Sequence, residues 1–271
     1  MRYVSSTLSA VVLGSLAVAA PAFAQHDHSS SDDTKPWSQA DEIWGEDAMA
    51  ESRAAVLHHH GRHPTDAIEV HRIEFQSGED EDVLLVDGDL WYGGDINRLV
   101  VKTEAEYSLD HDAFEEAEVQ ALWSRAISPY WDFQTGIRYD FKPEGLTHAV
   151  LGFEGMAPYR FDVDGAFFLS DEGDLTADVE IEYEFILSPR WHILPRAELG
   201  WSAQEIAELG KGAGFTSGQF GVRLAYDVVR EFAPFVGVEW QGSFGETEDM
   251  LSAAGETTDQ TVFVIGFHAW Y

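Results

Sequence analysis

The chain has 271 residues, with 49 Asp and Glu against 16 Lys and Arg, which gives a formal net charge of −33. Such a charge repels the phosphates of nucleic acids, so it excludes nucleic acid as a partner and favours the binding of cations. The chain has no Cys, so disulfides and thiolate ligands are excluded, and His, Met and carboxylate groups remain as possible metal ligands.

The first 24 residues have the layout of a cleaved secretory signal. Arg2 precedes an apolar run over residues 8–20, and the small-residue sequence AFA at positions 22–24 stands before Gln25. The apolar run is too short to cross about 30 Å of hydrocarbon as an anchor. We therefore expect residues 1–24 to be removed on export.

Residues 25–66 are polar, acidic and poor in β-branched residues, which predicts a flexible, mostly disordered arm. Within it, the segment DEIWGEDAMAESRAAVL is expected to form one short amphipathic helix. The arm also holds clustered His side chains, and imidazole suits copper, zinc and nickel. The alternative is that these His residues only keep a solvated tail disordered. The predicted ligands of the arm are His26, His28, His58, His59, His60 and His63.

Residues 67–271 alternate apolar and polar side chains in segments of about ten residues, the pattern of a membrane barrel. In Leu175–Phe185, for example, five Thr, Asp and Glu side chains share one face and apolar side chains share the other. The charged face suits a wet lumen and the apolar face suits lipid. The predicted fold is therefore all-β, a transmembrane antiparallel up-and-down β-barrel. The alternative is a soluble sandwich or lipocalin-like barrel, which would turn its apolar faces inward.

Twelve strands are favoured over ten, and the ten-strand alternative omits the first two. Both counts are even, as single-chain barrels require. The expected strands are residues 69–76, 83–92, 99–107, 116–123, 131–141, 148–155, 159–169, 175–185, 191–201, 220–228, 236–240 and 261–271.

The links between the strands predict an orientation. Short links with Pro (ISPY, MAPY, LSPR) alternate with longer polar loops, and short turns belong on the periplasmic side of an outer-membrane barrel. Aromatic residues beside the short turns predict an interfacial girdle on that side. The arm is then periplasmic. The predicted girdle consists of Trp91, Tyr92, Tyr130, Trp131, Tyr159, Trp191, Phe232, Trp270 and Tyr271.

The inward faces are predicted to carry more carboxylates than bases, so the lumen should attract cations. The alternative is a ladder of Arg and Glu pairs that plugs a narrow barrel. Two inward His side chains are expected near the periplasmic mouth, where they could receive metal from the arm, although a His of a barrel wall is more often only hydrogen-bonded. The predicted ligands at this mouth are Met156, Glu184, His192, Asp227 and His268.

An enzymatic role is not expected. His148 is predicted to lie near Asp140 and Glu144 at the outer rim, as in outer-membrane hydrolases, but no nucleophile accompanies them at a recognisable spacing.

Four strings resemble the copper resistance protein B family of outer-membrane proteins: WYGGDINRLVVKTEAE, EAEVQALWSRAISPYWDFQTGIRYD, PRAELGW and REFAPFVGVEW. The resemblance covers about Ala67 to Tyr271. It implies contact with outer-membrane lipid and a part in copper homeostasis alongside periplasmic copper proteins. Members often carry a Met- and His-rich arm, whereas this arm has only Met49. Thioethers select Cu(I), so the oxidation state of the copper stays open.

The sequence thus leads to the hypothesis of a non-enzymatic barrel that binds copper on its arm and in its lumen. It would either move copper across the outer membrane or sequester it there. The competing hypothesis is a general-diffusion or structural barrel without metal specificity.

Overall fold

The structure is a computed structural model that describes residues 38–61, 63–78 and 81–271, in two compact units that divide between Val56 and Leu57. The predicted signal peptide, His26 and His28 lie outside the described residues. None of the described helices has the length and apolar composition needed to cross a membrane.

The described part of the arm is helical, with α1 at Asp41–Trp44 and α2 at Glu46–His60. Gly45 separates the two helices with a φ of 88°, a value that Gly adopts without strain. Arg53 of α2 donates hydrogen bonds of 2.5 and 3.1 Å to the carboxylate of Asp41. The sequence predicted one short helix here, and the structure instead has two, which run as far as His60.

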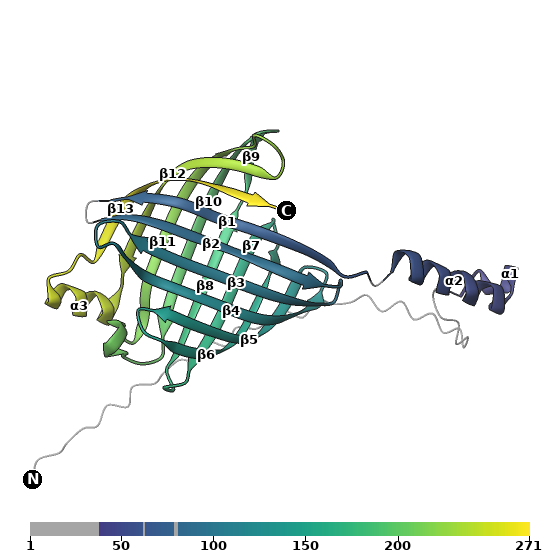
Figure 1. Ribbon diagram of the computed structural model, residues 1–271, viewed down its shortest axis with the longest axis horizontal. Helices are drawn as coiled ribbons and strands as arrows, with labels where there is room; N and C mark the ends of the chain where they lie inside the picture. The colour runs from purple at the N-terminus through teal and green to yellow at the C-terminus, as the bar shows by residue number, and fades with distance from the viewer. Residues whose placement is uncertain (1–37, 62, 79–80) are drawn as a thin grey trace, which may run out of the picture. The chain divides into compact units, whose positions relative to one another are not determined.

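The second unit contains a closed antiparallel β-barrel, in which the strands pair in chain order, except that β8 and β9 both pair with β10, and β13 pairs with β1 (Figure 1). The strands are β1 (Thr65–Ser77), β2 (Asp82–Gly93), β3 (Asn97–Ser108), β4 (Ala113–Ser128), β5 (Trp131–Lys142), β6 (Leu146–Ala157), β7 (Phe161–Ser170), β8 (Leu175–Tyr183), β9 (Phe185–Ser188), β10 (Trp191–Ser202), β11 (Gly214–Tyr226), β12 (Phe232–Ser243) and β13 (Asp259–Trp270).

β8 and β9 are two parts of one barrel strand, so the barrel has twelve strands, as predicted. Both pair with β10 in the same register, through Glu182 with Arg196 and Phe185 with Ile193. The interruption lies opposite Pro195, which has no backbone N–H to donate. β10 pairs with β11 without a break at Pro195. The backbone position that lacks an N–H therefore faces β8 and β9.

Every predicted segment contains a strand, and most of the strands extend further than predicted. Some boundaries were wrong: the strand predicted to reach residue 228 ends at Tyr226, and Tyr159 and Arg160 were assigned to a strand, but they form the turn before β7. Both have a positive φ, 69° and 67°, which does not fit an extended strand.

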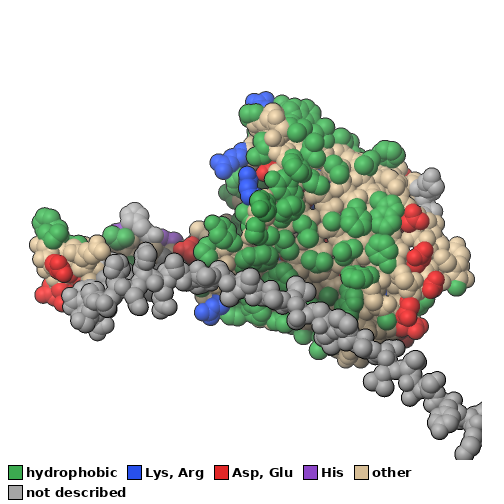
Figure 2. Space-filling model, turned by 180° about the vertical axis from the view of Figure 1, so that it is seen from behind, with side chains coloured by type: hydrophobic (Ala, Val, Ile, Leu, Met, Phe, Trp, Pro, Cys, Tyr) green, Lys and Arg blue, Asp and Glu red, His purple; other side chains and the backbone are tan. Residues whose placement is uncertain are grey.

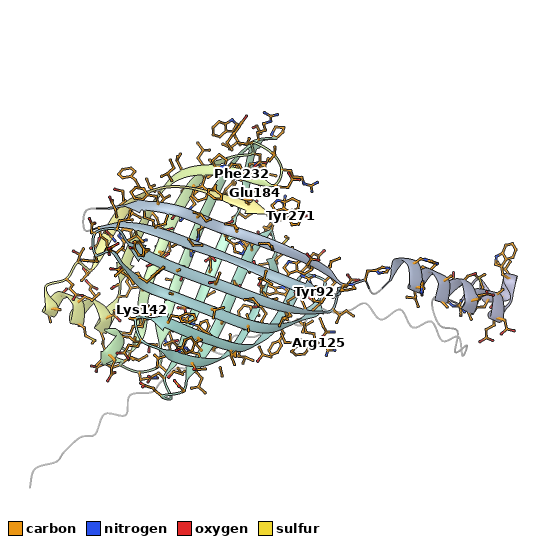
Figure 3. All side chains as sticks on the ribbon, viewed as in Figure 1. Tyr92, Arg125, Lys142, Glu184, Phe232 and Tyr271 are labelled. Carbon is orange, nitrogen blue, oxygen red and sulfur yellow. The ribbon has the colours of Figure 1, made fainter. Side chains whose placement is uncertain are left out.

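The two ends of the barrel differ. We call the end where β1 begins and β13 ends the terminal mouth, and the opposite end the loop mouth. Figure 3 places Tyr92, Arg125 and Tyr271 at the terminal mouth and Lys142 at the loop mouth. The terminal mouth has only short turns. At the loop mouth, residues 203–213 and 244–258 form long loops, which contain η1 (Ala207–Leu209) and α3 (Gly245–Ala254).

The outer surface of the barrel is a broad apolar band (Figure 2). Leu99, Ile137, Leu151, Val236 and Ile265 are all more than half exposed on it. An apolar outer face with a charged interior is the arrangement of a barrel that lies in the outer membrane. The soluble alternative, with apolar faces turned inward, was wrong.

The interior of the barrel contains apolar side chains as well as charged ones. Val100, Leu122, Val150 and Phe168 form a buried apolar cluster inside the wall of β3–β7, and Trp91 packs against them. Trp91 was predicted to belong to the interfacial girdle, and this position corrects that prediction.

Candidate functional site

A layer of buried ion pairs crosses the lumen. Arg223 of β11 donates hydrogen bonds of 2.7 and 3.0 Å to Glu74 of β1 and one of 2.9 Å to Glu239 of β12. Arg196 of β10 lies 2.7 Å from Glu180 of β8. Of these side chains, Glu74, Glu239, Arg223 and Arg196 are no more than 4% exposed. The charges are therefore largely withdrawn from water and lie in pairs, as buried ions require.

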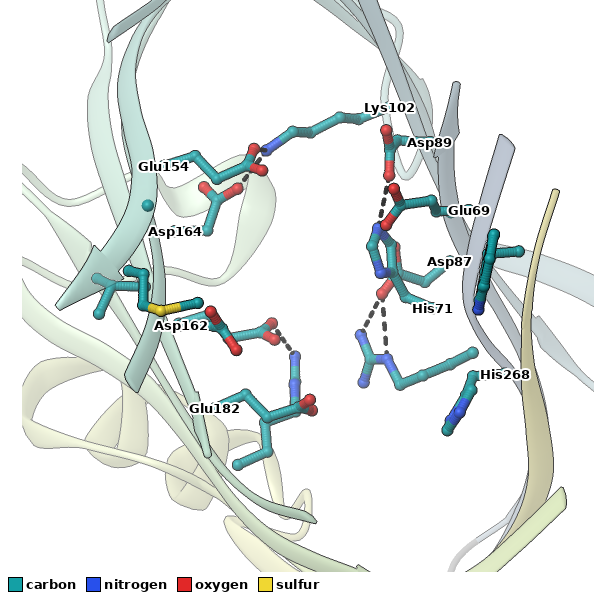
Figure 4. Close-up of a pocket in the computed structure, with 18 of the residues that line it drawn as sticks. Glu69, His71, Asp87, Asp89, Lys102, Glu154, Asp162, Asp164, Glu182 and His268 are labelled. Carbon is teal, nitrogen blue, oxygen red and sulfur yellow. Dashed lines mark hydrogen bonds and ion pairs between the residues drawn. The ribbon is translucent and has the colours of Figure 1, made fainter. Parts of the chain in front are cut away.

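A second bridge connects more distant strands. Lys102 of β3 lies 3.0 Å from Glu154 of β6 and also pairs with Asp164 of β7 (Figure 4). Together with the layer around Arg223, it joins strands that are not neighbours in the sheet. Pairs of basic and acidic side chains, as in the predicted ladder, are thus present among the described residues, and whether they plug the barrel stays a prediction.

An acidic cavity of about 770 Å³ lies at the terminal-mouth side of the buried layer. Ten carboxylates line it against five Lys and Arg side chains, together with His71 and His268. The excess of carboxylate expected from the sequence is therefore present in this cavity. Its field favours cations.

The structure brings three of the predicted mouth ligands into contact. His192 lies 2.7 Å from Glu184 through Nδ1 and 2.9 Å from Asp227 through Nε2. The two carboxylates thus approach opposite nitrogens of one ring, so a single ion could not bind all three side chains in this arrangement. Met156 and His268 line the acidic cavity with Glu184.

A different group has the geometry of a metal site. Glu69, His71 and Asp89 offer one ligand atom each, and these atoms all lie within 4.8 Å of one another. His71 Nε2 is 2.7 Å from the Asp89 carboxylate, and Figure 4 shows the three side chains together on the cavity wall. Glu69 and Asp89 are direct cross-strand partners. Like charges at such positions repel each other, and a bound cation would remove that repulsion.

Sequence reasoning missed His71 because of a β-bulge. Strict alternation would turn Arg72 into the lumen and His71 toward lipid. The register shifts between Val70 and Arg72, and both His71 and Arg72 line the cavity as a result. The one available signal was the apolar and polar pattern of β1, which changes phase at this point.

The described His residues of the arm lie near the end of α2. The rings of His58 and His59 meet edge to face, with centroids 4.9 Å apart. His63 Nε2 lies 3.3 Å from the backbone oxygen of His59. α2 ends at His60. Their role as metal ligands stays a prediction.

Comparison with known proteins agrees with the resemblance seen in the sequence. The family model for the copper resistance protein B precursor (CopB) matches residues 65–271. The chain belongs to this family. It is 35% identical to the copper resistance protein B homolog of Pseudomonas syringae pv. tomato, over 81% of this chain and 76% of that protein. It is 38% identical to copper resistance protein B of Escherichia coli, over 67% of this chain and 61% of that protein.

Solved structures similar to this one are barrels at low sequence identity. The NanC porin matches with a TM-score of 0.48 and 8% identity, over 76% of this chain and 99% of the porin. Outer membrane phospholipase A from Escherichia coli matches with a TM-score of 0.45 and 12% identity, over 78% and 92%. Family membership, rather than these likenesses, indicates a role in copper resistance.

Proposed function

We propose that this protein binds copper in the acidic cavity at its terminal mouth and does so as a non-enzymatic part of copper resistance. The Glu69, His71 and Asp89 group carries the proposal, because it combines an imidazole with two carboxylates in a cavity rich in negative charge. His268, Met156 and the group around His192 are further ligands along the same mouth.

The ligand chemistry favours Cu(II) over Cu(I) in this cavity. Imidazole and carboxylate suit Cu(II), whereas Cu(I) is selected by thioether and thiolate. Met156 is the one thioether that lines the cavity, and it is absent from the group of Glu69, His71 and Asp89. Copper is the cargo in this proposal.

The buried ion-pair layer supports retention of copper in preference to free diffusion. Arg223, Glu74 and Glu239 are almost fully buried, so copper would have to displace these paired charges to continue past them. Copper is therefore held at the terminal mouth, and it crosses only if the layer rearranges. The lipid of the outer membrane surrounds the barrel. A periplasmic arm would exchange copper with periplasmic copper proteins.

Copper stoichiometry tests the two parts of this proposal. We expect full-length protein to bind more Cu(II) than a variant that lacks residues 25–65, and we expect His71→Ala to lose a further site from the barrel. Unchanged stoichiometry without the arm would remove the arm from the mechanism. Unchanged binding in His71→Ala would remove the cavity group.

Flux into liposomes distinguishes copper handling from a general pore. We expect no permeation of neutral sugars, because the paired charges obstruct the lumen, together with retained copper binding. Sugar flux as fast as copper flux would instead favour the general-diffusion barrel.

A further inference from the structure

A second group of metal-ligating side chains lies at the loop mouth, at the opposite end of the barrel from the cavity. Glu81 ends the turn between β1 and β2, His111 lies in the turn between β3 and β4, and Glu115 lies near the start of β4. We propose that Glu81, His111 and Glu115 form a separate binding site for a divalent transition-metal ion.

The three side chains converge on one point. His111 Nδ1 lies 3.3 Å from a carboxylate oxygen of Glu115 and 3.5 Å from one of Glu81. All three ligand atoms are within 4.8 Å of one another. The contrast with His192 is informative, since there the two carboxylates approach different nitrogens. Here both approach the same nitrogen, so one ion can contact all three groups.

Neighbouring residues hold this arrangement in place. Ser108 is fully buried, and its hydroxyl lies 2.7 Å from Glu81 and 3.2 Å from His111 Nδ1. The backbone N–H of His111 also donates to this hydroxyl, at 3.2 Å. The turn is fixed further by a 2.5 Å hydrogen bond from Tyr107 to Asp112, which has a φ of 54°. Asp tolerates this left-handed conformation better than most residues do.

The two turns are also tied to each other. The backbone N–H of Asp82 donates a 3.0 Å hydrogen bond to the carboxylate of Asp110, across the β1–β2 and β3–β4 turns. The ligands therefore come from two turns whose relative position is fixed before any ion binds. Pre-organisation of this kind lowers the entropic cost of binding.

The two carboxylates of the group formed by Glu81, His111 and Glu115 favour the binding of a cation. In the described part of the chain, neither Glu81 nor Glu115 forms a salt bridge with Lys or Arg, and their ion-pair partner is His111. Both carboxylates also line a smaller cavity of about 260 Å³. Acidic side chains gather at this end of the outer surface (Figure 2), so the local field concentrates cations.

The ligand set identifies the class of ion. One imidazole and two carboxylates suit Cu(II) or Zn(II), and they do not suit Cu(I), which prefers sulfur. Copper as the physiological ion rests on the proposed function. Together, the two groups would give the barrel one metal site on each side of its buried ion-pair layer.

The test uses the full chain, purified in detergent, with His71→Ala introduced to silence the cavity site. Cu(II) binding is measured by electron paramagnetic resonance, and Zn(II) binding by calorimetry. In this background we expect His111→Ala and Glu115→Gln each to lose one bound ion, or to weaken binding at this site by at least about tenfold. His111→Ala should also reduce the nitrogen coupling in the Cu(II) spectrum by the contribution of one imidazole.

Glu256→Gln is the matched control, since it removes the same charge from an exposed position at the same mouth, and it should bind like the background protein. Circular dichroism confirms that each variant keeps its barrel. Equal binding by Glu115→Gln, His111→Ala and the control would overturn the loop-mouth site. That outcome is distinguishable from failure of the proposed function, which is read from His71→Ala alone.

Discussion

At the scale of single residues, the position of His71 depends on one inserted residue in β1. The bulge turns His71 into the cavity beside Arg72, where it meets the carboxylates of Glu69 and Asp89. The sequence predicted that acidic side chains would line the lumen, but strict alternation along β1 turned His71 toward lipid. Side chains alternate between the two faces of the sheet only along regular strands, and a bulge interrupts that alternation.

Removing one carboxylate from this group should weaken metal binding. We expect Asp89→Asn to lower the affinity of the cavity for Cu(II) by at least about tenfold, because a ligand is lost. Asp132→Asn is the control, since Asp132 lines the same cavity outside the group. Isothermal titration of both variants, in a chain without residues 25–65, measures the effect. Equal affinities would mean that only the general field of the cavity attracts the ion.

The buried Arg223 predicts a large effect on stability. We expect Arg223→Met to destabilise the barrel by about 3–5 kcal/mol, since it leaves Glu74 buried without its positive partner and Glu239 with only the more distant Arg196. Unfolding in detergent, followed by circular dichroism, measures this. Arg190→Gln at the exposed turn before β10 should cause little change. A small effect of Arg223→Met would show that water reaches the two carboxylates.

At the scale of elements, the strand formed by β8 and β9 shows how one residue interrupts a ladder without changing the register. The sequence predicted a single strand over Leu175–Phe185, and alternation does continue through it. The break at Glu184 is determined by Pro195 on the neighbouring strand. A prediction from one segment cannot include such an effect, because it depends on the partner.

Replacing Pro195 tests this explanation. We expect Pro195→Ala to restore a donor toward β8 and β9 and to slow hydrogen exchange of the amides around Tyr183–Phe185. The new hydrogen bond would contribute about 0.5–1.5 kcal/mol. Amides of β11 serve as the internal reference, because β10 already pairs with β11 without interruption. Unchanged exchange at Tyr183–Phe185 would assign the break to another cause.

At the scale of the whole molecule, the apolar band and the charged interior place the barrel in a membrane. If the band lies in the bilayer, the free-energy cost of a charged side chain on it should depend on the depth of that side chain. Leu151 is exposed at the middle of β6, and Phe141 is exposed near the loop-mouth end of β5. We expect Leu151→Arg to destabilise the barrel by about 2–4 kcal/mol and Phe141→Arg by about 0–1 kcal/mol.

Refolding from urea into lipid vesicles measures both variants of the apolar band. Equal costs at the two positions would contradict the assignment of Leu151 to the centre of the bilayer and of Phe141 to its edge. If Leu151→Arg and Phe141→Arg are similarly stable in detergent alone, the difference between them in vesicles is due to lipid. Detergent, unlike a bilayer, adapts to a charged side chain.

The sequence by itself determined the class of fold, the twelve strands, the acidic lumen and the family. These features follow from local alternation, turn residues and overall charge, which are written into consecutive residues. It also placed Glu184, His192 and Asp227 near one another, because register along regular strands is predictable.

Only the tertiary structure decided which side chains share a point in space. Glu69 and Asp89 meet because β1 pairs with β2 and a bulge turns His71 between them, and Glu81 meets Glu115 because two separate turns lie side by side. The ion pair of Arg223 with Glu74 likewise joins residues 149 positions apart. A metal site and a buried charge layer both need distances of a few ångströms, and closure of the barrel sets those distances.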